Sequence, residues 1–386
     1  MIRVKSIVFL MLFGLSTLIC YSEHFTVSLW LHSSMFSKNK TEAISELNEK
    51  LTFYKEIGIE NLYVFKIIKS EHNKGWSFLK YILKIAHKKG LKVHPVITSG
   101  YKVSVKGKIK RNSDWLIKDP FGKTLPYLNL SNPDVRKYIQ KKVKKLLKYN
   151  IDGIHLDYIR FPYLSSREPG DSIVSILIRV IRTVLNYYVP DHIYHGTADN
   201  YFSYDKKTLK SFEKYFNKSG DSNTNDEYVL KEWRKWNAGN VTLLVKNIRN
   251  TMKRSGKNIP LSAAIISNRG FAFNSLGQDW GKWSKTGVVD VLCPMIYSND
   301  KDWFNERLQE VLLMVQNGCK VYSGIAIESS TNQNTLEGVA SQVRIAKKTG
   351  ADGVVIFSGF SLTEEFGEVI KDEKNKWSTN NQSRTK

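Results

Sequence analysis

The residues best suited to chemistry lie in one short run, DGIHLDYIRFP, at positions 152–162 of the 386-residue chain. The middle of this run has the composition of a β-strand, in which successive side chains point to opposite faces. His155 and Asp157 then share one face, and the apolar Ile154 and Leu156 share the other. The pattern predicts a carboxylate at the end of a strand, on the face turned away from the helices.

Arg160 follows Asp157 closely in the chain. A nearby guanidinium favours the ionised form of a carboxyl group, so we expect Asp157 to be charged at neutral pH. An ionised carboxylate at a strand end suits a nucleophile, or a group that stabilises an oxocarbenium-like transition state. The alternative is a purely structural pair, in which Asp157 and Arg160 close the loop after the strand.

Chemistry of that kind at a glycosidic bond usually needs a second carboxyl group. Three acids are candidates, and Glu328, at the end of a predicted strand, is the first choice. The alternative for Glu328 is a salt bridge to a lysine at the rim. Asp279 is the second candidate, and its alternative is to cap a helix that contains Trp280 and Trp283. Asp300 is the weakest candidate. A separation of about 5–5.5 Å from Asp157 would predict retention of configuration, and about 6.5–9.5 Å would predict inversion.

Aromatic residues at strand ends suggest a surface for sugar rings, because the C–H faces of sugars gain from burial against aromatic rings. Trp30 is predicted to end the first strand and Tyr297 to follow the sixth. His94 and His155 lie within predicted strands, and a buried strand histidine such as His94 is more often a core residue. We expect Trp30, His94, His155, Tyr297 and the Arg160 guanidinium to contact substrate.

The elements that must position these residues repeat along the chain. Six times a helical pattern ends at Gly or Asn and an apolar, β-rich run follows, which is typical of helix C-termini that lead into strands. With two further runs, the predicted strands are 26–30, 62–65, 93–97, 154–156, 261–266, 289–292, 321–325 and 354–357. Eight strands alternating with helices predict a parallel α/β fold closed into a (β/α)₈ TIM barrel, whose catalytic residues lie at the C-terminal ends of the strands.

The predicted barrel domain covers residues 23–370 and carries a long insertion, 163–258, after the fourth strand. An insertion at this point lies on the catalytic face, so we expect a cap or a cleft wall. Residues 371–386 are polar and are predicted to be a disordered tail. The first 22 residues have the charged start and short apolar run of a secretory signal peptide, with an uncleaved N-terminal anchor as the alternative.

Composition limits the partners. Lys and Arg number 59 against 36 acidic residues, a formal net charge of +23 that is spread along the chain. This favours acidic partners such as anionic or cell-wall glycans, although a general bias toward Lys and Asn explains it equally well. No nucleotide-binding glycine loop, zinc motif or nucleic-acid-reading motif is present, so we expect no cofactor, no metal and no nucleic acid. Without its signal, the chain is expected to lack a stable membrane span.

The run at 152–162 resembles the fourth-strand motif of glycosyl-hydrolase-like family ten, which are secreted or envelope barrel proteins. Segments 129–136, 233–245, 278–283 and 290–297 resemble further parts of that family in the same order. The resemblance extends over roughly 25–362 and implies a glycoside-cleaving barrel that acts on polysaccharide. Many members have two adjacent acids at the end of this strand, whereas here Asp157 is followed by Tyr158. A chitinase-like reading is rejected, because its terminal glutamate is replaced by Ile159.

Two functions follow from the sequence. The first is a secreted glycoside hydrolase that uses Asp157 and a second carboxyl group on a polysaccharide. The second is a non-catalytic, basic glycan-binding barrel derived from such an enzyme. The first requires Asp157 for the release of reducing ends, whereas the second predicts salt-sensitive binding that does not depend on this residue.

Overall fold

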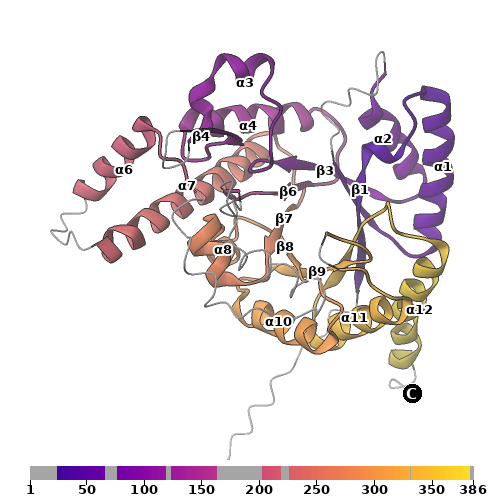
Figure 1. The fold of residues 1–386 in the computed structure, drawn as a ribbon. Coiled ribbons are helices and arrows are strands. Elements are labelled where there is room, and N and C mark those ends of the chain that lie inside the picture. Colours follow the sequence, from indigo (N-terminus) through magenta and orange to yellow (C-terminus); the bar gives the residue numbers. More distant parts are fainter. Residues whose placement is uncertain are drawn as a thin grey trace, which may run out of the picture.

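Eight parallel strands close into a barrel in this computed structural model, which describes residues 24–65, 76–118, 123–162, 202–218, 226–330 and 332–382. The predicted (β/α)₈ barrel is therefore confirmed (Figure 1). In order around the barrel, the strands are β1 Thr26–His32, β2 Asn61–Phe65, β3 Lys92–Thr98, β6 Ile154–Asp157, β7 Leu261–Ile266, β8 Val291–Met295, β9 Lys320–Ala326 and β10 Gly353–Phe357. The predicted signal sequence, 1–22, lies outside the described residues.

Helices surround the barrel (Figure 1). They are α1 Lys40–Glu56, α2 Phe78–Lys88, α3 Gly107–Arg111, α4 Pro133–Leu146, α6 Lys206–Lys218, α7 Asp226–Arg254, α8 Arg269–Leu276, α9 Trp280–Lys285, α10 Lys301–Met314, α11 Leu336–Thr349 and α12 Glu364–Gln382, with short 3₁₀ turns at Ser33–Met35 and Ser113–Trp115. A small antiparallel pair, β4 Leu116–Lys118 and β5 Thr124–Leu128, stands apart from the barrel. Within the described part of the chain, no helix has the length and apolar character that crossing a membrane requires.

Local sequence signals explain several of these elements. Asn132 caps α4 by accepting a hydrogen bond from the Asp134 amide, and Pro133 occupies the first helical turn, as predicted. In α1 the residues buried against the barrel are Ala43, Leu47, Leu51 and Tyr54, at the spacing of one helix face. The main boundary difference is β8, which begins at Val291 rather than at 289.

Acidic residues tie the N-terminal ends of neighbouring strands together. The carboxylate of Asp152 accepts the Val93 amide at 2.8 Å, and that of Asp290 accepts the Leu261 amide at 2.7 Å. Asp352 repeats the arrangement with the amide of the first apolar residue of β9, at 2.9 Å. Each bond satisfies a strand-end amide that the sheet leaves without a partner, so this end of the barrel is held by side chains as well as by backbone pairing.

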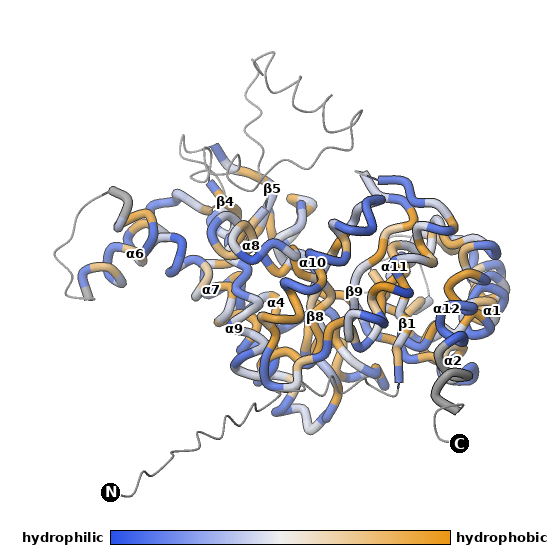
Figure 2. The backbone as a smooth tube through the Cα atoms, turned by 90° about the horizontal axis from the view of Figure 1, so that it is seen from below, coloured by the Kyte–Doolittle hydropathy of each residue, from blue (hydrophilic) through white to orange (hydrophobic). Residues whose placement is uncertain are grey.

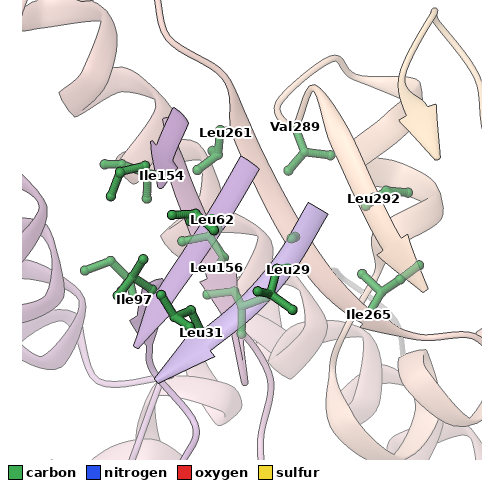
Figure 3. Packing of buried hydrophobic residues seen from close by; sticks show 14 of the residues in the cluster. Leu29, Leu31, Leu62, Ile97, Ile154, Leu156, Leu261, Ile265, Val289 and Leu292 are labelled. Atoms are coloured by element: carbon green, nitrogen blue, oxygen red, sulfur yellow. The ribbon is translucent and has the colours of Figure 1, made fainter. Parts of the chain in front are cut away.

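The main hydrophobic core lies between the strands and the helices. Leu29, Leu62 and Leu156 point outward from three strands and are fully buried (Figure 3). The hydropathy pattern agrees, with hydrophobic segments on the inner sides of the helices (Figure 2). A second cluster fills the barrel interior and includes Trp30, Tyr63, Val96 and Cys293. The strand face that carries Asp157 therefore points into the barrel, as the alternation predicted.

The segment predicted as an insertion, 163–258, has two different parts. Residues 163–201 lie outside the described part of the chain. The second part contains α7, which packs on α4 and α8 through buried residues such as Leu244 and Ile248. Since α7 occupies the helix position between β6 and β7, it is a regular helix of the barrel. α6, by contrast, projects away from the barrel in both views (Figures 1 and 2).

The predicted disordered tail also differs in the structure. α12 continues to Gln382, so it includes most of the segment 371–386. Glu373 is 2% exposed and forms two hydrogen bonds with Arg344, at 2.7 and 3.1 Å. Lys374 donates to the Gly58 carbonyl at 2.9 Å. These buried polar contacts hold the helix, and a composition-based prediction does not detect them.

Candidate active site

Asp157 is the last residue of β6, at the C-terminal end of the barrel. Its residue surface is only 6% exposed. Burial raises the pKa of the carboxyl group from 3.8 to about 6, against the opposing effects of the Arg160 charge and a backbone hydrogen bond from Tyr158. The predicted location is thus observed. Desolvation outweighs the guanidinium, yet a carboxyl group with a pKa of about 6 is still mostly ionised at pH 7, as the sequence predicted.

The residue after Asp157 holds it in place. Tyr158 has a φ of +50°, in the left-handed region that non-glycine residues seldom adopt. In this conformation its amide donates to Oδ1 of Asp157 at 2.6 Å. Its carbonyl accepts from the Gly100 amide at 2.6 Å and from the Ser99 hydroxyl at 3.1 Å. The loop after β3 therefore fixes the loop after β6, and one carboxylate oxygen of Asp157 is occupied by the backbone.

Gly100 is essential to this contact. A Cβ atom at this position would lie 1.7 Å from the Arg160 carbonyl oxygen. Such an overlap involves backbone atoms, which cannot move aside without changing the loop that carries Tyr158 and Arg160. The packing of the two loops thus requires a residue without a side chain at position 100.

Arg160 does not form an ion pair with Asp157, the structural alternative to a catalytic role. No charged atoms of the two residues lie within the 4.0 Å of a salt bridge, although Arg160 still acts on Asp157 through its charge. The guanidinium lies over the ring of Tyr158, 5.0 Å from its centroid. Its Nε is buried without a hydrogen-bond partner, and burial lowers the pKa of the group. The loop-closing salt bridge that the sequence offered as an alternative is absent between these two residues.

Trp30 and His155 lie inside the barrel. β1 extends to His32, so Trp30 is not the last residue of its strand, and it is 2% exposed. Its indole N–H donates to Nε2 of His155 at 3.1 Å, which leaves the proton of the neutral imidazole on Nδ1, 2.8 Å from the Ser262 hydroxyl. His155 also stacks on Tyr63, with ring centroids 4.1 Å apart. The structure gives both residues interior contacts rather than a place on an open surface.

His94 lies nearer the other end of the barrel. It is 4% exposed, and burial lowers its pKa to about 4, so the ring is neutral. Neither ring nitrogen has a partner. His94 lines a cavity of about 770 Å³ formed by strand starts, together with Asn61, Lys92 and Lys320. Because this cavity opens at the N-terminal ends of the strands, His94 is remote from the end that carries Asp157.

The other candidate carboxylates have separate environments. Asp279 caps α9 by accepting the Lys282 amide at 3.3 Å, the structural alternative that the sequence left open. Asp300 caps α10 in the same way, with the Asp302 amide at 2.9 Å. Glu328 is exposed just beyond β9. Among the described groups, Arg160 is the one whose charge shifts the pKa of Asp157, so none of these acids is strongly coupled to it.

Tyr297 lies just beyond β8 and stacks on Phe357, the last residue of β10, at a centroid distance of 5.4 Å. Burial, followed by the charge of Asp157, raises the pKa of Tyr297 well above its usual value. The tyrosine is partly exposed. The structure thus places Tyr297 close enough to Asp157 for the charge of one to act on the other.

Further aromatic residues at this end were missed from the sequence. The His32 ring stacks on Phe65 at 6.0 Å and lies 5.9 Å from Phe360, which is 64% exposed. His32, Phe65 and Phe357 are each the last residue of a strand. The predicted second and eighth strands already end at Phe65 and Phe357, so inspecting strand ends would have found these two. His32 was missed because the predicted first strand stopped at Trp30. Within the described ranges, no cluster of His, Cys, Asp and Glu is arranged to hold a metal ion.

Comparison with known proteins agrees with this architecture. A family model described as Glycosyl hydrolase-like 10 matches residues 168–336, which confirms the resemblance predicted from the sequence. Comparison with curated protein sequences gives no match. Among solved structures, the PgaB (BpsB) glycoside hydrolase domain from Bordetella bronchiseptica is similar at a TM-score of 0.62 and 10% identity, covering 91% of this chain and 99% of that one.

Two other solved structures share the fold. The β-galactosidase from the psychrophilic Marinomonas ef1 has a TM-score of 0.61 and 11% identity, over 94% of this chain and 60% of that one. The C-terminal domain of a putative chitinase from Desulfitobacterium hafniense DCB-2 has a TM-score of 0.52 and 12% identity, over 92% of this chain and 99% of that one. At these identities the similarity establishes the barrel fold alone.

Proposed function

We propose that this protein is a secreted or envelope glycoside hydrolase that cleaves a polysaccharide, with Asp157 as its proton donor. The observation that carries the proposal is a buried carboxyl group at the C-terminal end of a barrel strand, with its pKa raised to about 6. A carboxylic acid of this pKa keeps its proton far better near neutral pH than an exposed aspartate does. Burial therefore favours an acid role over the nucleophile expected from the sequence.

In the proposed reaction, Asp157 protonates the glycosidic oxygen as the bond from that oxygen to the anomeric carbon breaks. Water attacks the oxocarbenium-like carbon, and a second carboxylate accepts the proton of the water. We assign that role to Glu328, which is exposed just beyond β9, with β8 and β7 between β9 and the strand of Asp157. Both carboxyl groups regain their starting protonation when Glu328 releases that proton to solvent and Asp157 takes one up from solvent.

Aromatic side chains next to Asp157 support a sugar substrate. Tyr297 is partly exposed and stacks on Phe357, which also contacts Trp30 edge-on at 6.1 Å. We assign Tyr297 and Phe357 to the wall that holds the sugar ring, and Trp30 and His155 to its support below. Rings that are themselves locked by packing position a substrate with little loss of side-chain entropy.

The experiment is to assay Asp157→Asn for release of reducing ends from a panel of polysaccharides. General acid catalysis contributes about 10²–10⁴-fold, so we expect turnover to fall by at least about 100-fold. Asp279→Asn is the matched control, because Asp279 caps α9 and should leave turnover unchanged. Glu328→Gln tests the second carboxyl group. Unchanged turnover in an Asp157→Asn protein that is folded, as shown by a cooperative thermal unfolding transition, would exclude Asp157 as the acid.

The glycan-binding alternative has one observation in its favour. In the described part of the chain, no second carboxylate shifts the pKa of Asp157. A non-catalytic barrel would bind polysaccharide equally well in the wild type and in Asp157→Asn, and would release no reducing ends from any substrate. Release of reducing ends by the wild type but not by Asp157→Asn decides for the hydrolase.

A further inference from the structure

Arg160 is the one charged side chain beside Asp157 that the fold leaves without a polar contact. Its Nε is buried and makes no hydrogen bond, and no salt bridge to Arg160 occurs among the described residues. Its described contact is with the face of the Tyr158 ring. A cation–π contact offsets only part of the cost of removing a guanidinium from water, so the group retains an unmet demand for an anion.

The surroundings of Arg160 are suited to present it to a ligand. The residue as a whole is partly exposed, although its Nε is buried. The Gly100 contact fixes its backbone, and the Tyr158 ring packs against its guanidinium. A planar guanidinium held in this way offers parallel N–H donors, the geometry that binds a carboxylate through two hydrogen bonds. Its position three residues after Asp157 places such a ligand beside the proposed acid.

We propose that Arg160 binds a carboxylate carried by the substrate, so that the glycan cleaved at this site is an acidic one. This inference rests on the proposed function. The net charge of +23 acts in the same direction, since a basic protein attracts acidic polymers over long distances. A neutral glycan would leave the buried guanidinium unsatisfied in the complex, which opposes its binding.

Binding of a carboxylate at Arg160 has a consequence for Asp157. The groups that face Asp157 are Arg160 and Tyr158 from its own loop, and Cys293 and Tyr297 from β8 and the loop that follows. The tyrosines and the cysteine are neutral at pH 7, because burial raises the pKa of each. Arg160 is therefore the charge that holds the Asp157 pKa down. An anion on Arg160 offsets that charge, and the acid keeps its proton to higher pH in the complex.

The first experiment measures binding of D-glucuronate and D-glucose, which differ in one carboxylate, by titration calorimetry or NMR. We expect the wild type to bind glucuronate at least about 10-fold more tightly, because hydrogen bonds between charged groups are stronger than those between neutral groups. Arg160→Gln should remove the preference, and Arg160→Lys should restore only part of it. Lys320→Gln, at the opposite end of the barrel, is the matched control and should keep the preference.

The second experiment compares hydrolysis of acidic polysaccharides with hydrolysis of the same polymers after reduction of their carboxyl groups to alcohols. We expect the reduced polymers to be cleaved at least about 10-fold more slowly by the wild type but not by Arg160→Gln. Equal cleavage of both forms by the wild type would overturn the inference and leave the proposed hydrolase intact. Failure to cleave any polymer would overturn the hydrolase, and the glucuronate preference would then decide the role of Arg160 alone.

Discussion

A single carboxyl group shows how burial, rather than neighbouring charge, sets the chemistry of this site. Asp157 has a guanidinium nearby, which by itself would lower its pKa, yet its pKa rises to about 6. The reason is that Arg160 acts from beyond salt-bridge distance while the whole carboxyl group is desolvated. The pKa of Asp157 therefore depends more on its burial than on its nearest charged neighbour.

The raised pKa of Asp157 predicts a cost in stability. The folded protein binds this proton more tightly than the unfolded chain, so the favourable contribution is complete below about pH 4 and is lost as the pH rises through about 6. Asp157→Asn removes the charge and keeps an oxygen to accept the Tyr158 amide. We expect this variant to be more stable than the wild type by up to about 3 kcal/mol at pH 7, and by little at pH 4. Urea denaturation at both pH values measures the difference, and an equal effect at the two would contradict it.

The same shift predicts the pH dependence of activity. A general acid must be protonated, so the proposed reaction should slow as the pH rises through the Asp157 pKa of about 6. We expect kcat/KM to fall about tenfold per pH unit above that value. Arg160→Gln removes the charge that lowers this pKa and should move the falling limb to higher pH. If the falling part of the kcat/KM profile stays at the same pH in Arg160→Gln, the loss of activity is due to the titration of another group.

At the scale of elements, the loops after β3 and β6 form one unit that positions the site. Gly100, Tyr158 and Arg160 meet through backbone atoms, so the position of the acid depends on a contact between two loops that are far apart in the sequence. The left-handed conformation of Tyr158 persists because this contact and the hydrogen bond to Asp157 hold it.

Two glycine substitutions, one at this contact and one far from it, should have opposite effects on stability. Gly100→Ala should destabilise the protein by about 2–4 kcal/mol and reduce turnover, because its Cβ would overlap the Arg160 carbonyl. Gly239→Ala, in the middle of α7, meets no atom within 4 Å and should stabilise the protein by about 0.5–1 kcal/mol. Chemical denaturation of both variants checks the pair. Equal stability of Gly100→Ala and the wild type would mean that the loops separate without cost.

At the scale of the whole molecule, the chain end closes the layer of helices. α12 packs on α11, and Lys374 of α12 donates to the Glu60 carboxylate at 2.8 Å beside the start of β2. Glu373 neutralises Arg344 of α11. The last helix thus joins elements from both ends of the sequence, next to the seam where β10 pairs with β1.

Truncation of the chain tests this role of α12. Ending the chain after Asp372 removes the buried Glu373 and the Lys374 contacts, and we expect a loss of about 2–4 kcal/mol in the free energy of unfolding. Ending it after Gln382 removes no described contact and should change stability by less than about 0.5 kcal/mol. Thermal and urea denaturation of the two truncated proteins compare the effects, and similar stability in both would mean that the contacts of Glu373 and Lys374 add nothing.

The sequence by itself determined the barrel, its eight strands, and the position of Asp157 at the C-terminal end of the fourth of them. Helix ends, apolar runs and alternation are local patterns, and local patterns are sufficient for these features. Even at this level the last helix was missed, because Glu373 and Arg344 are held by a contact between separate segments.

Only the tertiary structure decided the environment of each side chain. Trp30 and His155 are joined inside the barrel, His94 lies toward its other end, and Asp279 caps a helix. The pKa of Asp157 likewise depends on burial. Desolvation and hydrogen bonding are properties of atoms brought together from distant parts of the chain, so spacing along the sequence identifies candidates but does not give their pKa values or their partners.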